Sequence, residues 1–125
     1  MEAEILQTLR EIKSILYVIG LIISIAVVFK VFEFITSIIK NFKKAIKEVW
    51  RNEANEYFDK GEYDSLISHC EKRIETYPND VTAIWWLARA HLENGNREKA
   101  DEYFEKVTNI EPSWKEEHVL PYLKN

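Results

Sequence analysis

The feature that most constrains the fold of this chain is a repeat of 34 residues in its second half. Gly61 recurs as Gly95 and Pro78 recurs as Pro112, so two of the three glycines and two of the three prolines keep this spacing. A fixed period of this length is typical of stacked helix-turn-helix units. The sequence therefore predicts an all-α fold in which pairs of helices stack on one another.

Other positions keep the same register. The first copy reads Trp50-x2-Glu53-Ala54-x2-Tyr57, Leu66-x3-Cys70 and Pro78, and the second reads Ile84-x2-Leu87-Ala88-x2-His91, Ala100-x3-Phe104 and Pro112. This spacing resembles the tetratricopeptide repeat, whose pattern is Trp-x2-Leu-Gly-x2-Tyr, Ala-x3-Phe and Pro. Five positions depart from it: Glu53, Leu66, Cys70, Ile84 and His91. The resemblance implies a domain over residues 47–125, with repeats at 47–80 and 81–114 and a cap at 115–125.

Residues that end or cap helices support these boundaries. Gly61 and Gly95 suit the left-handed residue that ends a helix, and Pro78 and Pro112 stop the helix that follows. Asp80 stands where a capping side chain is expected at the next helix start.

The C-terminal part of the chain carries a signal for the start of another helix. The spacing Ser113-x-x-Glu116 fits a capping box. It predicts a short final helix over about residues 114–120, ended by Pro121, that covers the end of the stack with Trp114, Val119 and Leu120.

The first half of the chain predicts a membrane anchor. Residues 14–29 carry no charge and are almost wholly apolar. As a helix they are about 24 Å long, whereas a helix that crosses a bilayer needs about 20 residues, or about 30 Å. The apolar pattern continues past Lys30, which Glu33 can neutralise from one turn away. We expect a helical tail at 1–13, a transmembrane helix with an interfacial extension at 14–39, and a basic connector helix at 40–46.

Two alternatives to a membrane span are disfavoured. A signal peptide cleaved near Ser24-Ile-Ala26 is one, but the apolar stretch runs well beyond that point and the leading segment is not clearly basic. A buried helix of a soluble domain is the other, but the rest of the chain is too small to bury it.

Flanking cations predict the orientation. Arg10 and Lys13 precede the span, whereas five cations follow it: Lys40, Lys43, Lys44, Lys47 and Arg51. Cytoplasmic flanks carry the excess of Lys and Arg. We therefore expect a single-pass protein of the cell membrane, with its N-terminus outside and its repeats in the cytoplasm. The interfacial cations are predicted to be Lys13, Lys30, Lys40, Lys43 and Lys44.

Two apolar patterns follow this helix. One is a heptad seam that predicts parallel self-association through residues 5–26: Ile5, Leu9, Ile12, Leu16, Ile19, Ile23 and Ala26. Because apolar residues inside a span yield some heptad by chance, only the first three are informative. The other is a stripe at helical spacing that predicts a continuous helix into the first repeat: Ile35, Ile38, Ile39, Phe42, Ile46, Val49 and Trp50.

The resemblance also implies where a partner binds. In this family the first helix of each pair lines a concave face, which places on that face Arg51, Asn55, Phe58, Asp59, Thr82, Trp85, Arg89 and Glu93. Trp85 is the strongest candidate because large aromatic residues dominate binding energies; the alternative is that Trp85 packs against the connector helix. Arg51 and Asn55 resemble half of a carboxylate clamp, but Trp86 stands where the matching Asn would be.

Composition excludes several functions. Residues 51–125 carry ten Lys/Arg and sixteen Asp/Glu, a net charge of −6, which argues against a nucleic-acid partner. Cys70 is the only cysteine, and the three histidines are not at metal-ligand spacing with it or with one another. No glycine loop for phosphates is present. We expect no cofactor, no metal and no enzymatic activity.

These observations predict a membrane-tethered adaptor or scaffold that binds a protein or peptide partner at the cytoplasmic membrane surface. Two alternatives remain open. One is a structural subunit of a homo-oligomeric membrane assembly, and the other is a small membrane-active regulator.

Overall fold

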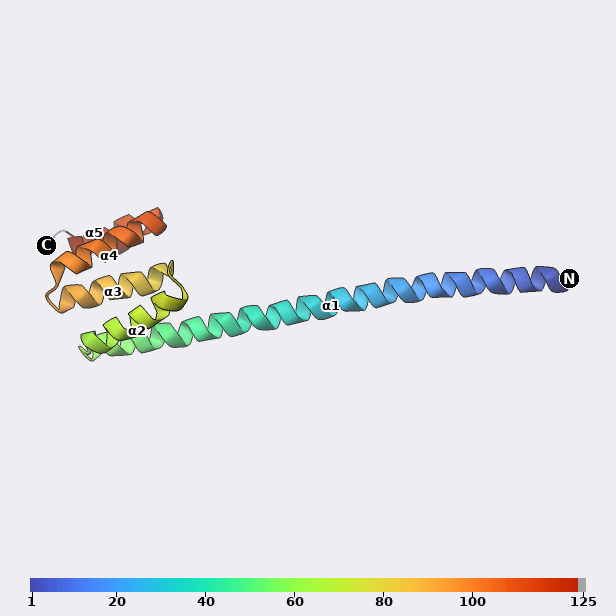
Figure 1. Ribbon diagram of the computed structural model, residues 1–125, viewed down its shortest axis with the longest axis horizontal. Helices are drawn as coiled ribbons and strands as arrows, with labels where there is room; N and C mark the ends of the chain where they lie inside the picture. Colours follow the sequence, from blue (N-terminus) through green and yellow to red (C-terminus); the bar gives the residue numbers. More distant parts are fainter. Residues whose placement is uncertain (124–125) are drawn as a thin grey trace. The chain divides into compact units, whose positions relative to one another are not determined.

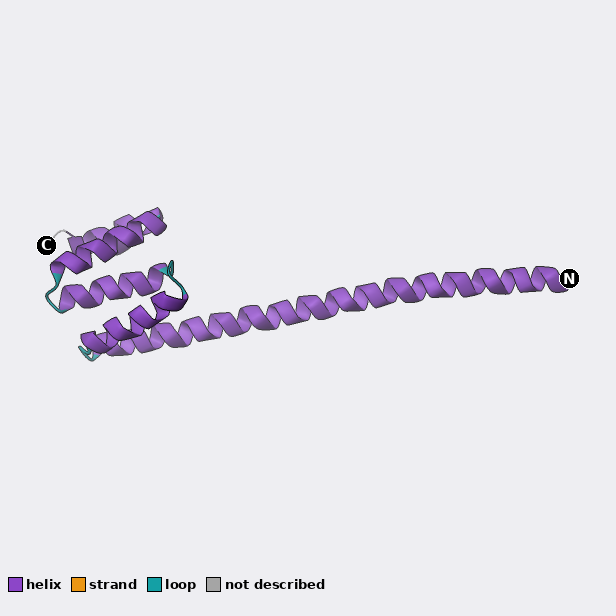
Figure 2. Ribbon diagram, in the orientation of Figure 1, coloured by secondary structure: helices purple, strands orange, loops and turns teal. Residues whose placement is uncertain are grey.

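The structure, a computed structural model, describes residues 1–123, and every regular element in that range is a helix (Figure 2). In chain order these are α1 (Glu2–Asp59), α2 (Tyr63–Thr76), α3 (Val81–Glu93), α4 (Arg97–Ile110), the 3-10 helix η1 (Pro112–Trp114), the π-helix η2 (Lys115–Val119) and α5 (Leu120–Leu123) (Figure 1). The predicted all-α fold is confirmed. The chain divides into two compact units, Met1–Lys47 and a second unit that begins at Glu48.

The first unit consists of α1 up to Lys47. Helical hydrogen bonds are supplemented by side chains: the Ser24 hydroxyl donates to the carbonyl oxygen of Gly20 at 2.8 Å. Lys30 Nζ donates to Glu33 Oε2 at 3.0 Å, which confirms the predicted ion pair. The large apolar side chains of this unit are all exposed. By length and composition, α1 could cross a membrane.

The second unit buries equivalent positions of two helix pairs. The equivalent buried residues are Trp50 and Ile84, Ala54 and Ala88, Leu66 and Ala100, and Cys70 and Phe104. The two residues of each pair are 34 positions apart, so residues that repeat in the sequence occupy equivalent places in the packing. Ala54 and Ala88 are fully buried, as small residues must be where two helices approach closely.

Helix α3 lies at the centre of this packing because it is apolar on two faces. Ala83, Leu87 and Ala90 join a core cluster with residues of α1 and α2, including Trp50 and Leu66. Its other face joins a second cluster with α4 and η2, made of Ile84, Ala88, Ala100, Phe104, Val107 and Val119. The two clusters are therefore continuous through α3.

The turns inside the two pairs are also equivalent. Gly61 has φ +71° and Gly95 has φ +83°, the left-handed conformation that closes a helix. The residue after each glycine donates its backbone N–H five residues back, from Glu62 to Tyr57 at 2.9 Å and from Asn96 to His91 at 2.8 Å. This is the Schellman pattern, and it confirms the predicted helix ends.

The end of the stack differs from the prediction. Ser113 Oγ donates to Glu111 Oε1 at 2.7 Å instead of capping a helix, and η2 has no side-chain cap, so the predicted capping box is wrong. Pro121 does not end the final helix either, because it lies inside α5. A proline in the first turn of a helix lacks only an N–H that has no intrahelical partner. Val119 is nevertheless buried, and Trp114 and Leu120 are half-buried, as expected of a cap.

Candidate partner-binding site

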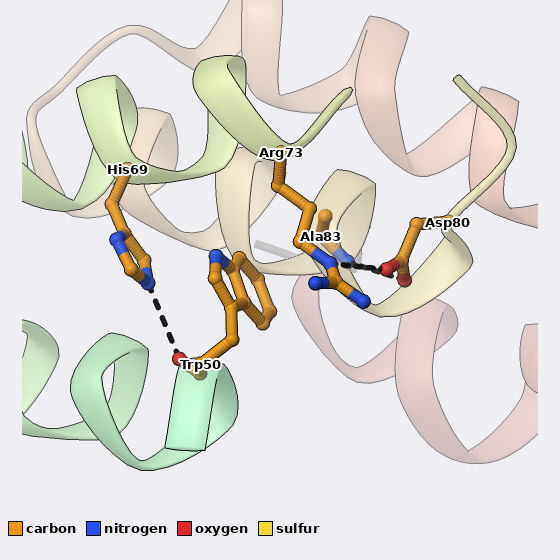
Figure 3. Close-up of polar contacts among 5 residues, drawn as sticks. All are labelled: Trp50, His69, Arg73, Asp80 and Ala83. Atoms are coloured by element: carbon orange, nitrogen blue, oxygen red, sulfur yellow. Dashed lines mark hydrogen bonds and ion pairs between the residues drawn. The ribbon is translucent and has the colours of Figure 1, made fainter. Parts of the chain in front are cut away.

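The start of α3 is set by Asp80, which positions the predicted binding residues that follow it. Asp80 Oδ1 accepts a hydrogen bond from the Ala83 backbone N–H at 3.3 Å, so the predicted N-cap is confirmed. Arg73 Nε of α2 donates to Asp80 Oδ2 at 2.7 Å (Figure 3). Only 13% of the Arg73 side chain and 11% of the Asp80 side chain are exposed. A charge-assisted bond in such surroundings holds the first residue of α3 against α2.

Figure 3 also shows how α2 is held to the end of α1. His69 Nε2 lies 3.2 Å from the Trp50 carbonyl oxygen, which accepts its hydrogen bond. The two rings stack with centroids 5.0 Å apart and an interplanar angle of 5°. The Arg73 guanidinium lies 5.2 Å from the Trp50 ring centroid. Arg73 therefore joins the contacts of both α1 and α3, and it fixes the first helix pair relative to the second.

The adjacent tryptophans of α3 belong to different clusters. Trp86 contacts Phe58 of α1, with ring centroids 5.5 Å apart. Trp85 faces the C-terminal segment, with its ring centroid 6.3 Å from that of His118 and 6.0 Å from that of Tyr122. Both tryptophans are half-buried. The packing of Trp85 is thus provided by the C-terminal segment and not by the connector helix.

Arg89, one turn beyond Trp85, is surrounded by aromatic rings. Its guanidinium carbon lies 4.4 Å from the ring centroids of Phe58 and Tyr122 and 5.1 Å from that of Trp85. Its Nη1 also donates to the Tyr122 hydroxyl at 3.0 Å. These are cation–π distances. The structure therefore brings together three residues predicted for one face, Phe58, Trp85 and Arg89.

Sequence reasoning missed Tyr122, which joins this cluster from α5. It follows Val119 by three residues, a spacing that puts both side chains on one side of a helical segment. Its ring stacks on Phe104 with centroids 5.6 Å apart. The interpretation of Pro121 as the end of the helix hid this spacing.

The C-terminal segment is bound to this face by hydrogen bonds as well. Trp85 Nε1 donates to the His118 carbonyl oxygen at 2.6 Å. Arg97 Nη2 donates to the carbonyl oxygens of Tyr122 at 3.2 Å and Leu123 at 3.0 Å. The chain itself therefore occupies Trp85 Nε1 and Arg89 Nη1, two polar atoms of the predicted face.

The remaining residues predicted for the binding face are exposed or half-buried. Arg51, Asn55, Asp59 and Glu93 are exposed, and Thr82 is half-buried. These exposed side chains are the part of the predicted face that stays open to a partner.

The predicted interfacial lysines all lie on α1. Lys13 Nζ is 6.0 Å from the ring centroid of Tyr17, and Lys30 pairs with Glu33 as above. Lys40, Lys43 and Lys44 are exposed.

Three titratable groups of the second unit are shifted by burial. His91 is 7% exposed, and burial lowers its pKa; its ring stacks on Tyr103 with centroids 5.6 Å apart. Burial raises the pKa of Tyr103 and, far more, that of the Cys70 thiol. Cys70 and His91 are thus packed residues. In residues 1–123, no three His, Cys, Asp or Glu side chains gather as a metal site would require.

Residues 81–113 match the family model of the tetratricopeptide repeat. This part of the chain is a tetratricopeptide repeat. The matched repeat comprises α3, the turn at Gly95 and α4. The preceding helix pair shares its buried positions and its turn geometry at the 34-residue spacing described above. Tetratricopeptide repeats form a protein-interaction fold without catalytic chemistry of its own, and the predicted face lies on the first helix of each pair.

Proposed function

We propose that this protein is a membrane-tethered adaptor that holds a protein or peptide partner at the cytoplasmic surface of the cell membrane. The observation that carries the proposal is the presence, in one chain, of a tetratricopeptide repeat and an apolar helical segment that the chain leaves wholly exposed. The repeat supports binding to a partner, and the exposed helix supports tethering to lipid.

The exposed apolar surface of α1 favours a tether on energetic grounds. Apolar side chains along the span are about half or more exposed, for example Leu21 at 62%, Ile22 at 61% and Phe29 at 64%. Removing apolar surface from water is worth about 25 cal/mol per Å², so such a helix requires lipid or another chain around it. The cations that follow the span favour the orientation with the repeats in the cytoplasm.

The docking face consists of the predicted residues that the chain leaves open. Arg51 and Asn55 lie one turn apart on α1, and Glu93 lies on α3, all exposed. Arginine is one of the residues that dominate binding energies. A helix or extended peptide laid along the first helices of both repeats is the docking mode expected of this face. No catalytic step is part of the proposal.

Membrane insertion is tested first, with the full chain expressed in cells. Alkaline extraction should leave the protein in the membrane pellet. Protease added to the outside of intact cells should remove an N-terminal epitope and spare a C-terminal one. Recovery in the alkaline supernatant would reject the tether, and loss of the C-terminal epitope would reject the orientation.

Partner binding is tested in the same membranes by site-specific photo-crosslinking. A photoreactive side chain at Asn55 should yield a discrete crosslinked protein, whereas one at the exposed Lys99 of α4 should not. Arg51→Ala should weaken the crosslink from position 55, and Lys99→Ala should leave it unchanged. Equal products from both positions, or none from either, would reject this docking face.

A second candidate function is supported by the N-terminal heptad seam. Ile5, Leu9 and Ile12 precede the span among polar residues and are 59%, 56% and 48% exposed. Such residues favour a homo-oligomeric assembly, in which the chain is a structural subunit. Native mass measurement in detergent tests this candidate, because a subunit held by this seam gives a defined oligomer that Leu9→Glu should dissociate.

A further inference from the structure

Beyond the span, α1 carries an apolar stripe that the proposed function does not use. Its residues follow spacings of four and three, as the a and d positions of a heptad do, and all are exposed: Ile35 at 48%, Ile39 at 47%, Phe42 at 66%, Ile46 at 46% and Val49 at 57%. The same register runs back through the span over Val18, Leu21, Ile25, Val28 and Phe32. Because apolar residues inside a span yield some heptad by chance, the informative a and d positions are Ile39, at the edge of the span, and Phe42, Ile46 and Val49 beyond it.

This stripe differs from the seam over residues 5–26. Continued by seven residues at a time from Ala26, the earlier seam meets Glu33, Lys40 and Lys47. Charges at these core positions end it inside the span. The stripe remains apolar where the helix leaves the hydrocarbon, among neighbours that, apart from Ile38 and Ala45, are polar.

Lipid cannot cover the outer part of the stripe. An amphipathic helix on a membrane surface lies in the plane of the interface, whereas a spanning helix crosses that plane. A helix that did both would have to bend sharply near residue 36, and sharp bends require Pro, Gly or an inserted group. α1 is one helix from Glu2 to Asp59, and no Gly or Pro occurs between Gly20 and Gly61. Ile39, Phe42, Ile46 and Val49 therefore extend beyond the bilayer with the span.

The polar side of the same segment faces away from the stripe. At 100° per residue, Lys40, Lys44 and Lys47 fall on the side of the helix opposite Phe42 and Ile46, and Lys43 lies at the edge of the stripe. Two copies that met along the stripe would therefore keep Lys40, Lys44 and Lys47 apart and in water. The next a and d positions after Val49 are Glu53 and Glu56, which would repel their equivalents in a second copy. The stripe thus ends where α1 enters the first repeat.

We propose that a second copy of this chain covers the stripe, so that two α1 helices pair in parallel through Ile39, Phe42, Ile46 and Val49 just outside the cytoplasmic face of the membrane. The pairing is parallel because both copies cross the bilayer in the same direction, and it rests on the proposed span. Inside lipid, apolar side chains gain little by meeting one another. The water-exposed end of the stripe is therefore where pairing is stabilised.

Cysteine crosslinking of the full chain in membranes tests the proposal. In a Cys70→Ala background, Phe42→Cys should form a disulfide-linked dimer on mild oxidation. Lys44→Cys, on the opposite side of the same turn, should form at least about tenfold less, because cysteines whose Cα atoms are more than about 7 Å apart cannot be bridged. Ile39→Cys provides a second position that should crosslink like Phe42→Cys.

A charge introduced into the stripe gives an independent readout. Ile46→Glu should lower the Phe42→Cys crosslink by about tenfold, since two carboxylates would face each other in the pair. Lys47→Glu changes charge at the next residue, outside the stripe, and should leave the crosslink intact. Equal crosslinking at positions 42 and 44 would overturn the pairing, as would its persistence in Ile46→Glu.

Two further outcomes separate this proposal from the proposed function. If these variants pellet on alkaline extraction but do not crosslink at positions 39 and 42, the pairing is wrong and the tether stands. If they appear in the alkaline supernatant, both fail. Quenching of a fluorophore on Phe42→Cys by brominated phosphatidylcholine would show that lipid covers the stripe and would overturn the pairing alone.

Discussion

Side chains of the same kind are exposed in the first unit of this chain and buried in the second. Phe42 in the first unit is 66% exposed, whereas Phe104 in the second is fully buried. Both stand in α-helices, so the helix itself does not decide burial. Phe104 is buried because α3, α4 and η2 supply apolar neighbours from three elements, and Phe42 lies outside both core clusters of the described chain. The apolar side chains of the repeat module are covered by its own helices, whereas those of the apolar helix require lipid or a second chain to cover them.

The largest expected effect tests whether lipid is what the first unit requires. Replacing Ile22 and Ile23 by Asp should cost about 5 kcal/mol or more of insertion free energy, at about 2.5–3.5 kcal/mol for each charge near the centre of a span. The double variant should move from the alkaline pellet to the supernatant, whereas Ile22→Val with Ile23→Val should stay in the pellet. A charged variant that still pelleted would contradict the assignment of the exposed surface to lipid.

The second test compares the two phenylalanines directly. Phe104→Ala should lower the free energy of unfolding by about 3–5 kcal/mol, because it leaves a cavity in the core. Phe42→Ala should change the free energy of unfolding of the second unit by less than about 0.5 kcal/mol, because Phe42 lies outside both of its core clusters. Urea unfolding of the full chain in mild detergent, followed by tryptophan fluorescence, measures both. Equal losses would mean that the second unit does not depend on its core as the buried fractions indicate.

The third test concerns the junction between the helix pairs. Asp80→Ala removes the N-cap of α3 and the partner of Arg73, and it should cost about 2 kcal/mol, of which the cap supplies about 1 kcal/mol. Asp80→Asn keeps a capping oxygen and should lose less. Unfolding by urea ranks the two variants. A larger loss in Asp80→Asn than in Asp80→Ala would contradict the role of the cap.

The glycines give effects of opposite sign in the two units. Gly95 has φ +83°, so Gly95→Ala should destabilise the second unit by about 1 kcal/mol or more. Gly20 lies inside α1, and no atom lies within 4 Å of the place that an added Cβ would occupy, so Gly20→Ala should favour the helix by up to about 1 kcal/mol. Thermal unfolding of the full chain and the helical circular dichroism of the variants test the two signs.

The smallest effect is a pH dependence confined to the second unit. Burial lowers the pKa of His91, so the unfolded chain binds this proton more readily than the folded one. The free energy of unfolding should therefore fall as the pH drops below the ordinary histidine pKa of about 6.5, and level off below the folded pKa. His91→Tyr, the residue typical of the family, should flatten this dependence below the ordinary histidine pKa. An unchanged pH profile in His91→Tyr would assign the dependence to other groups.

The same comparison explains which parts of the molecule could be predicted. The helix pairs, the left-handed Gly61 and Gly95, the Asp80 cap and the buried Cys70 and His91 depend on signals within a few residues or on the 34-residue period. The end of the chain could not be predicted in this way. Ser113 bonds to Glu111 two residues away instead of capping a helix. Whether Pro121 stops a helix depends on contacts with α3 and α4 that are distant in sequence, such as the hydrogen bonds from Trp85 to His118 and from Arg97 to Tyr122.

The amino-acid order alone was enough to predict the helical repeat, the long apolar helix and the heptads along α1, because each arises from the periodicity of a single helix or from a recurring spacing. The state of the predicted docking face required the folded chain. Only packing in three dimensions brings Tyr122 onto Arg89 and the His118 carbonyl onto Trp85, and so leaves Arg51, Asn55 and Glu93 as the exposed part of that face. A local pattern specifies which side of a helix is apolar, but the element that covers that side comes from elsewhere in the chain or from outside it.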